Sequence, residues 1–221
     1  MKRRLLQFDK KLFVDLYDAH VIKVGSFRLR IGEREPYRYV TTPFLVDVRV
    51  LISYPTLLQR VAKAYENVLQ KLHFDRMAAI PYAALPIVVA LSLVNKKPWI
   101  YPRKEVKQYG TQKVIEGEFC DGDTVVIVDD TLTSGSSVLL AVEKLKQAGL
   151  VVHDVVLLID RGEIGTSRLE ANGLRVISLY HINDILQELF LRGKISKEQY
   201  DLIQVGHEVL KASVIKEQSH V

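Results

Sequence analysis

The chain has 221 residues, 48% hydrophobic and 26% charged, which suits one domain with an appendage and disfavours disorder and coiled coils. The single cysteine, Cys120, excludes an internal disulfide and a four-cysteine zinc site. The net charge of +5 is compatible with an anionic substrate or with nucleic acid. No apolar run reaches the ~18 residues that a membrane span needs. The N-terminal segment MKRRLLQF is basic, but charged residues follow it before any long apolar stretch, which is not typical of a signal peptide. We therefore expect a cytoplasmic protein with no membrane partner.

The first 50 residues differ in pattern from the rest of the chain. Helices are predicted over 8–19 and 54–72. Between them, residues 21–49 predict short extended pieces broken by glycine and proline. The breaking residues are Gly25, Gly32, Pro36 and Pro43. We interpret residues 1–50 as a small lid that packs on the sheet of the main domain.

Beyond residue 76, apolar β-branched runs alternate with helical patterns. The predicted strands are 77–81, 98–101, 124–128, 151–159 and 174–179, and the predicted helices are 85–95 and 134–148. Such alternation is typical of an α/β fold with a mostly parallel sheet and helices on both faces. We therefore predict an α/β core over 51–181. Two C-terminal helices over 182–221, separated near Gly193 and Ser196, are expected to pack on it.

A polar loop follows the strand predicted over 124–128. The strand ends in Asp129 and Asp130, and seven residues, mostly hydroxylated, lead into the next helix. Ligands of parallel sheets bind at the carboxyl ends of strands. Free backbone N–H groups at a helix N-terminus attract anions, and Gly135 allows close approach of a phosphate. The lysine of a Walker loop is absent, which disfavours an ordinary nucleotide triphosphatase. The alternative is a hydroxyl-rich helix cap after a buried strand.

The segment DDTLTSGSS, residues 129–137, resembles the phosphoribosyl pyrophosphate (PRPP) motif of type I phosphoribosyltransferases. In that family the acid pair holds the ribose hydroxyls and the loop holds the 5-phosphate. Residues 80–93 resemble the family's segment that approaches the pyrophosphate. The resemblance implies PRPP binding by Asp129, Asp130, Thr131, Leu132, Thr133, Ser134, Gly135, Ser136, Tyr82 and Ala83.

The basic segment 103–117, RKEVKQYGTQKVIEG, resembles the catalytic loop of orotate phosphoribosyltransferases. Arg103, Lys104 and Lys107 match its cations. Tyr109 replaces a histidine, as in the orotate domain of animal uridine monophosphate synthase. Cations suit a pyrophosphate leaving group, and a mobile loop could close over the site and exclude water. With Asp129 and Asp130, these four residues are the implied catalytic set. The alternative for the segment is a solvated charge run.

A third resemblance concerns the base. LIDRGEIG, residues 158–165, resembles the turn whose arginine recognises orotate, here Arg161. The alternative for Arg161 is a surface ion pair with Asp160 or Glu163. Orotate contacts are also expected from Arg30, Phe44 and Thr133. Arg30 replaces the family's lysine, Phe44 could stack on the pyrimidine ring or belong to the core, and an extra stretch over 33–40 lies near the base.

The resemblance covers roughly residues 12–182 and implies a pentosyltransferase of pyrimidine (UMP) biosynthesis. Such an enzyme would transfer phosphoribose from PRPP to orotate, giving orotidine 5′-monophosphate and pyrophosphate. The resemblance also implies Mg²⁺ held mainly by the substrate, with no direct protein ligand, and a homodimer that shares the basic loop between sites. The histidines show no metal-ligand spacing.

Two alternatives stay open. One is a phosphoribosyltransferase for another base, such as a purine. The other is a PRPP-binding regulator that also binds nucleic acid. The chain has no helix-turn-helix signature and no dense basic stripe with interleaved aromatics, so we expect no nucleic-acid partner.

Overall fold

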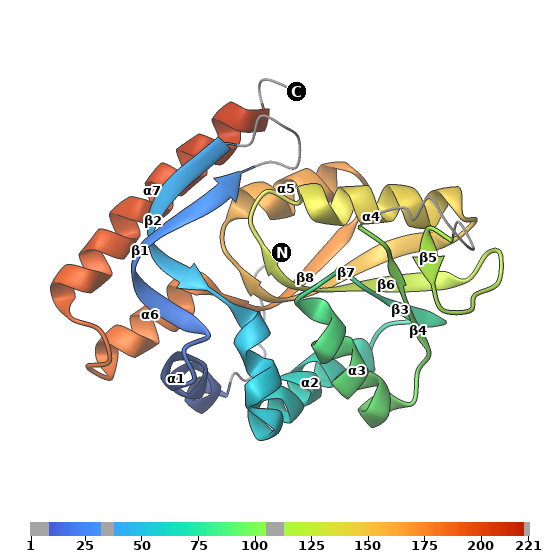
Figure 1. Ribbon diagram of the computed structural model, residues 1–221, viewed down its shortest axis with the longest axis horizontal. Helices are drawn as coiled ribbons and strands as arrows, with labels where there is room; N and C mark the ends of the chain where they lie inside the picture. Colours follow the sequence, from blue (N-terminus) through green and yellow to red (C-terminus); the bar gives the residue numbers. More distant parts are fainter. Residues whose placement is uncertain (1–8, 32–37, 105–112, 219–221) are drawn as a thin grey trace.

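The computed structural model describes residues 9–31, 38–104 and 113–218. Its centre is a six-stranded sheet in the order β5-β4-β3-β6-β7-β8 (Figure 1). Only the edge strand β5 runs antiparallel to its neighbour, so the predicted mostly parallel sheet is confirmed. The strands are β3 (Arg76–Ala79), β4 (Trp99–Pro102), β5 (Ile115–Glu116), β6 (Thr124–Leu132), β7 (Val151–Asp160) and β8 (Arg175–His181).

Helices cover both faces of this sheet, as the continuous apolar strands predicted. On one face lie α1 (Lys10–Asp18), α2 (Pro55–Leu69), α3 (Ala84–Asn95) and α6 (Ile182–Leu191). On the other lie α4 (Ser136–Gln147) and α5 (Glu163–Ala171) (Figure 1). A short 3-10 helix, η1 (Val48–Ser53), leads into α2.

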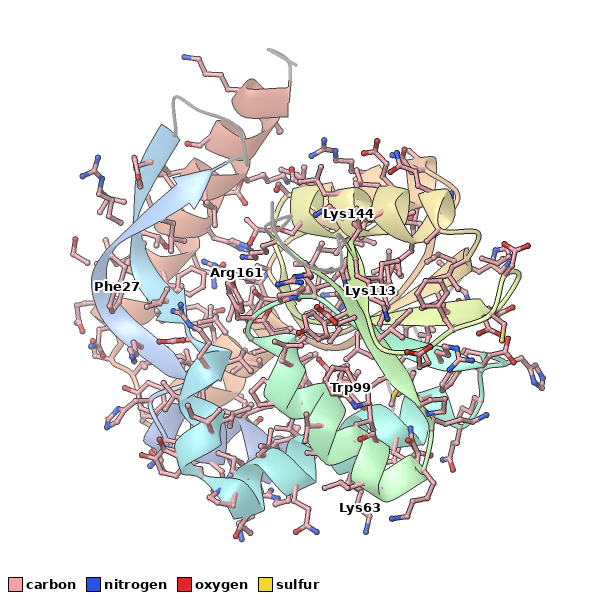
Figure 2. The ribbon with its side chains drawn as sticks, turned by 45° about the vertical axis from the view of Figure 1, so that its right-hand side comes forward. Phe27, Lys63, Trp99, Lys113, Lys144 and Arg161 are labelled. Atoms are coloured by element: carbon pink, nitrogen blue, oxygen red, sulfur yellow. The ribbon has the colours of Figure 1, made fainter. Side chains whose placement is uncertain are left out.

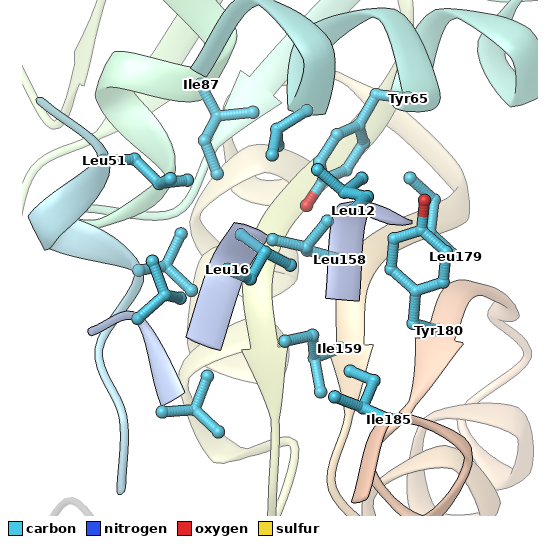
Figure 3. Close-up of a cluster of buried hydrophobic side chains, with 14 of the residues drawn as sticks. Leu12, Leu16, Leu51, Tyr65, Ile87, Leu158, Ile159, Leu179, Tyr180 and Ile185 are labelled. Atoms are coloured by element: carbon cyan, nitrogen blue, oxygen red, sulfur yellow. The ribbon is translucent and has the colours of Figure 1, made fainter. Parts of the chain in front are cut away.

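Alternating residues of the central strands divide between two hydrophobic clusters, because successive strand side chains point to opposite faces. In β6, Val126 and Val128 join the cluster beneath α1, α2, α3 and α6, whereas Val125 and Ile127 join the cluster beneath α4 and α5. Figure 3 shows the first cluster, where Leu12 and Leu16 of α1 lie beside the strand residue Leu158. Both faces of β6 are thus buried, and only its carboxyl end is left for polar residues.

The segment predicted as short extended pieces is a long antiparallel hairpin. It consists of β1 (Ile22–Ile31) and β2 (Arg38–Val46), which pair from Ile22↔Val46 to Ile31↔Arg38. A register shift between Val24 and Phe27 accommodates Gly25. The pairing continues on both sides of Pro43. Proline has no backbone N–H to donate, and an edge strand of a two-stranded sheet tolerates this because one side of the strand has no neighbouring strand.

The hairpin packs along α7 (Lys197–Gln218) (Figure 1), and its Phe44 and Val46 belong to the same hydrophobic cluster as Leu158 of the central sheet. Ile203 of α7 belongs to that cluster too. That residues 1–50 act as a lid stays a prediction. The close approach depends on Gly206, because a Cβ there would lie 2.1 Å from Cδ of Pro43. Ser196 and Gln199 cap the start of this helix reciprocally. Gln199 N–H donates to Ser196 Oγ at 3.2 Å, and the Gln199 side chain accepts from Ser196 N–H at 2.8 Å.

In the ranges that the structure describes, no helix is both long enough and apolar enough to cross a membrane.

Gly206→Ala tests the packing of α7 on the hairpin. At an exposed position inside a helix, replacing glycine with alanine raises the free energy of unfolding by about 1 kcal/mol. Here we expect the free energy of unfolding to fall by about 1–3 kcal/mol, because the new methyl group overlaps Pro43. Urea denaturation followed by circular dichroism measures the change. Val205→Ala, at a neighbouring side chain that is 63% exposed, is the control. Equal or higher stability of Gly206→Ala would contradict the packing.

Candidate active site

A cleft of about 360 Å³ opens at the carboxyl ends of β3, β6 and β7. These strands are neighbours in the sheet, so the segments that follow them converge at one edge. The cleft brings together most of the residues predicted from separate motifs. They are Tyr82, Ala83, Lys104, Asp129, Asp130, Thr131, Leu132, Thr133, Ser134, Gly135, Ser136 and Arg161.

The acid pair lies at the end of β6. Asp129 is only 5% exposed, and the Asp130 N–H donates to its Oδ1 at 2.9 Å. The hydroxyl of Tyr65, a fully buried residue of α2, donates to the backbone carbonyl of Asp129 at 2.6 Å. Burial raises the pKa of both carboxyl groups, and the adjacent Asp130 charge raises the pKa of Asp129 further. The nearby cations Lys104 and Arg49 act in the opposite direction.

The phosphate loop, residues 131–136, overlaps the elements on either side of it. Strand β6 continues to Leu132, where it still pairs with Asp160 of β7, and helix α4 begins only at Ser136. Gly135 precedes the helix with a φ of +76°, in the left-handed region that glycine adopts without strain. The Ser134 hydroxyl lies 3.1 Å from the Ser136 hydroxyl. The loop thus presents hydroxyl groups and backbone N–H groups at a helix N-terminus.

Sequence reasoning missed Arg168, which supports this loop. From α5, its Nη1 donates to the Ser134 carbonyl at 3.2 Å and to the Ser136 hydroxyl at 2.8 Å. No sequence motif marked it, because α5 was not predicted and the contact spans more than thirty residues. Arg49, which also lines the cleft and pairs with Asp47 at 2.7 Å, was missed as well.

The predicted basic residues separate into two groups. Lys104 lines the cleft, and its Nζ lies 5.0 Å from the ring centroid of Tyr82. Arg103 does not line the cleft. Its guanidinium pairs with Glu116 at 2.9 Å, and its carbonyl accepts a hydrogen bond from Lys144 Nζ at 2.7 Å, so Arg103 is tied to β5 and α4. Lys107, Tyr109 and the side chain of Arg30 lie outside the described residues.

Arg161 is a buried cation with unused donors. It is 6% exposed, and its Nε and Nη2 have no hydrogen-bond partner among the described residues. Burial lowers its pKa to about 10. Its guanidinium does not pair with Asp160, which instead accepts from Gly162 N–H at 2.8 Å and from the Thr166 hydroxyl at 3.0 Å. The alternative of a surface ion pair is therefore wrong, and the unpaired donors point to an anionic ligand.

Phe44 does not line the cleft, contrary to the stacking role considered for it. Its side chain is fully buried, and its ring centroid lies 4.9 Å from Cζ of Arg161. The ring supports the guanidinium from below by a cation–π contact. Arg161 thus lies between the hairpin and the central sheet (Figure 2).

No protein-family model matches the chain. Over 186 residues it is 37% identical to an orotate phosphoribosyltransferase of Pyrobaculum aerophilum, covering 84% of this chain and 92% of that protein. The chain belongs to the orotate phosphoribosyltransferase family. It is also 42% identical over 189 residues to the bifunctional enzyme PyrF/PyrE of a Nostoc species, covering 86% of this chain. It spans only 38% of that bifunctional relative.

The structural comparison agrees with this family. UMP synthase of Leishmania donovani matches 89% of this chain with a TM-score of 0.78 and 33% sequence identity, and the match covers 41% of that chain. The fold is therefore that of a type I phosphoribosyltransferase, as the sequence predicted.

Asp129→Asn tests whether the acid pair is a source of instability. A carboxyl group whose pKa is raised on folding binds more protons when folded, so its contribution to stability falls as the pH rises. We expect the amide variant to be more stable than the unmodified protein at pH 8, with the gain shrinking as the pH approaches 5. Thermal denaturation across this range measures it. Asp121→Asn, at an exposed position, is the control, and a gain that does not vary with pH would contradict the account.

Proposed function

We propose that this protein is an orotate phosphoribosyltransferase, which transfers phosphoribose from PRPP to orotate and forms orotidine 5′-monophosphate and pyrophosphate. The observation that carries this proposal is the unpaired, buried guanidinium of Arg161 in the same cleft as the phosphate loop. A product with a carboxylate on its base and a phosphate on its ribose matches both features. The names of the relatives support the same reaction.

The phosphoribosyl donor is matched by three groups of the cleft. The phosphate loop offers N–H and hydroxyl donors to the 5-phosphate. Asp129 and Asp130 accept hydrogen bonds from the ribose hydroxyls, and these bonds are strongest when the acceptor is a carboxylate. Lys104 lies where its charge can neutralise the pyrophosphate as it leaves.

Arg161 recognises the carboxylate of the base. Its two unused donor groups suit a carboxylate that accepts two parallel hydrogen bonds. Thr133, which also lines the cleft, adds a hydroxyl near this position. A guanidinium that is desolvated and supported by the Phe44 ring is preorganised for this contact, so little reorganisation is needed on binding.

The reaction is a displacement at the anomeric carbon of the ribose. The bond from that carbon to pyrophosphate breaks and its electron pair leaves with pyrophosphate. The bond to the ring nitrogen of orotate forms, and that nitrogen gives its proton to a basic oxygen of the departing pyrophosphate or to water. Positive charge develops on the ribose as the bond breaks. The carboxylates of Asp129 and Asp130 stabilise that charge, while Lys104 stabilises the negative charge that grows on pyrophosphate.

The donor set of the cleft fits Mg²⁺ held mainly by the substrate. Hard cations prefer oxygen ligands, and the acid pair supplies carboxylate oxygens beside the ribose position. In the described part of the chain, no cluster of three or more histidine, cysteine or acidic side chains could hold a metal by itself. When bound, Mg²⁺ supplies neutralising charge to the pyrophosphate oxygens.

A homodimer is part of the proposal. Helix α3 and the turn before it leave an apolar stripe exposed beside the cleft, where Tyr82 of the turn and Val89 and Leu93 of the helix are 61%, 44% and 67% exposed. A second copy of the chain on this stripe would bury it, and the sharing of the basic loop between the two sites stays a prediction. The cytoplasmic location and the absence of a nucleic-acid partner stay predictions.

A spectrophotometric assay tests the function. Purified protein with PRPP, Mg²⁺ and orotate should remove the ultraviolet absorbance of orotate, and the loss should need all three additions. Uracil and hypoxanthine are the comparison bases. Turnover of hypoxanthine without orotate would indicate a purine enzyme, and PRPP binding without any turnover would indicate a regulator.

Lys104→Ala should lower kcat about 10²–10³-fold while the fold is retained, because a charge that stabilises the leaving group is lost. The assay above measures kcat, and circular dichroism checks the fold. Lys63→Ala removes a cation at an exposed position of α2, away from the cleft, and should leave kcat unchanged. Normal turnover by Lys104→Ala would contradict the role of Lys104.

Arg161→Ala should lower kcat/KM for orotate about 10–100-fold, the range expected for hydrogen bonds to a charged group. The KM for PRPP should change little. Arg161→Lys keeps a charge without the planar fork and should recover only part of the loss. If both substrates are affected equally, Arg161 does not recognise the base.

A further inference from the structure

Helix α7 reaches the position assigned to the base, although it lies outside the segment that resembles the family motifs. Its Leu210 lines the cleft, and its His207 contacts the backbone carbonyl of Arg161 through Nε2. The His207 ring also meets Phe44 edge-on, with centroids 6.2 Å apart and an interplanar angle of 79°. Thus Phe44 from β2, Arg161 after β7 and His207 from α7 form one cluster, which we call the arginine cluster.

Arg161 lines two cavities, so few groups pack against its side chain. Its position therefore depends on the groups that do contact it. A second cavity of about 220 Å³ shares Thr133, Arg161 and Leu210 with the cleft and is also lined by His207. Nε and Nη2 of Arg161 have no partner in the described part of the chain, so no hydrogen bond at these atoms fixes the guanidinium. The Phe44 ring supports the guanidinium, and the His207 contact anchors the backbone of Arg161.

We infer that His207 is a positioning residue that aligns Arg161 with the carboxylate of the base, and this inference rests on the proposed function. The carbonyl oxygen of Arg161 can only accept a hydrogen bond, so Nε2 of His207 must carry the hydrogen and donate it in this contact. Gly206 lets the helix approach Pro43 closely enough for His207 to reach the carbonyl. The C-terminal helix thereby contributes to the choice of base without contacting the reacting atoms.

His207→Ala tests the inference through the separation of the two substrates. KM for orotate should rise about 3- to 10-fold, the range expected for loss of one hydrogen bond. KM for PRPP should stay the same, and the preference for orotate over uracil, which lacks the carboxylate, should fall by a similar factor. His207→Gln keeps an N–H donor and should recover most of the preference. His153→Ala, at an exposed position on β7, is the matched control.

The outcomes are distinguishable. An unchanged preference for orotate in His207→Ala would overturn the positioning role, and so would an equal rise in KM for both substrates or a failure of His207→Gln to recover the preference. If the unmodified protein does not use orotate at all, the proposed function is wrong, and the role of His207 falls with it. If His207→Ala does not fold, the result for His207→Gln decides alone, since full loss of the preference there contradicts the inference.

Discussion

The site depends on the burial of two adjacent carboxyl groups at the end of β6. Apolar side chains cover both faces of this strand up to Val128, and Asp129 follows while still nearly enclosed. Such burial disfavours the charged form and costs stability unless a ligand or a cation compensates. The surrounding structure supplies the partial compensation. Tyr65 fixes the backbone of Asp129 from α2, and Lys104 brings a positive charge from beyond β4.

The topology of the sheet then determines which other groups can join this pair. Because β3 and β7 flank β6, the segments beginning at Ile80 and Arg161 reach the same edge. The hairpin and α7 close the remaining side and support Arg161 through Phe44 and His207. The phosphate loop and the base-recognising arginine are therefore held by different layers of the molecule. A change in the packing of α7 can alter base recognition without altering the phosphate loop.

The sequence could predict what is encoded in contiguous residues. The strand that leads into Asp129 and Asp130, the loop after it and the helix that follows are local patterns, and the structure bears them out. The unsuccessful predictions involve contacts between distant segments. The hairpin was interpreted as broken pieces because Gly25 and Pro43 signal breaks, whereas pairing along its length and the support of α7 keep both strands continuous. Arg168 and His207 act across long sequence separations that no local motif records.

The most direct test of the account is a crystal structure of the protein with orotidine 5′-monophosphate, since one molecule then reports both halves of the cleft. We predict the phosphate against the backbone N–H groups of residues 131–136, the ribose hydroxyls on Asp129 and Asp130, and the base carboxylate on the guanidinium of Arg161. A product whose phosphate occupies the loop while its carboxylate lies away from Arg161 would contradict the central claim that this buried arginine selects the base.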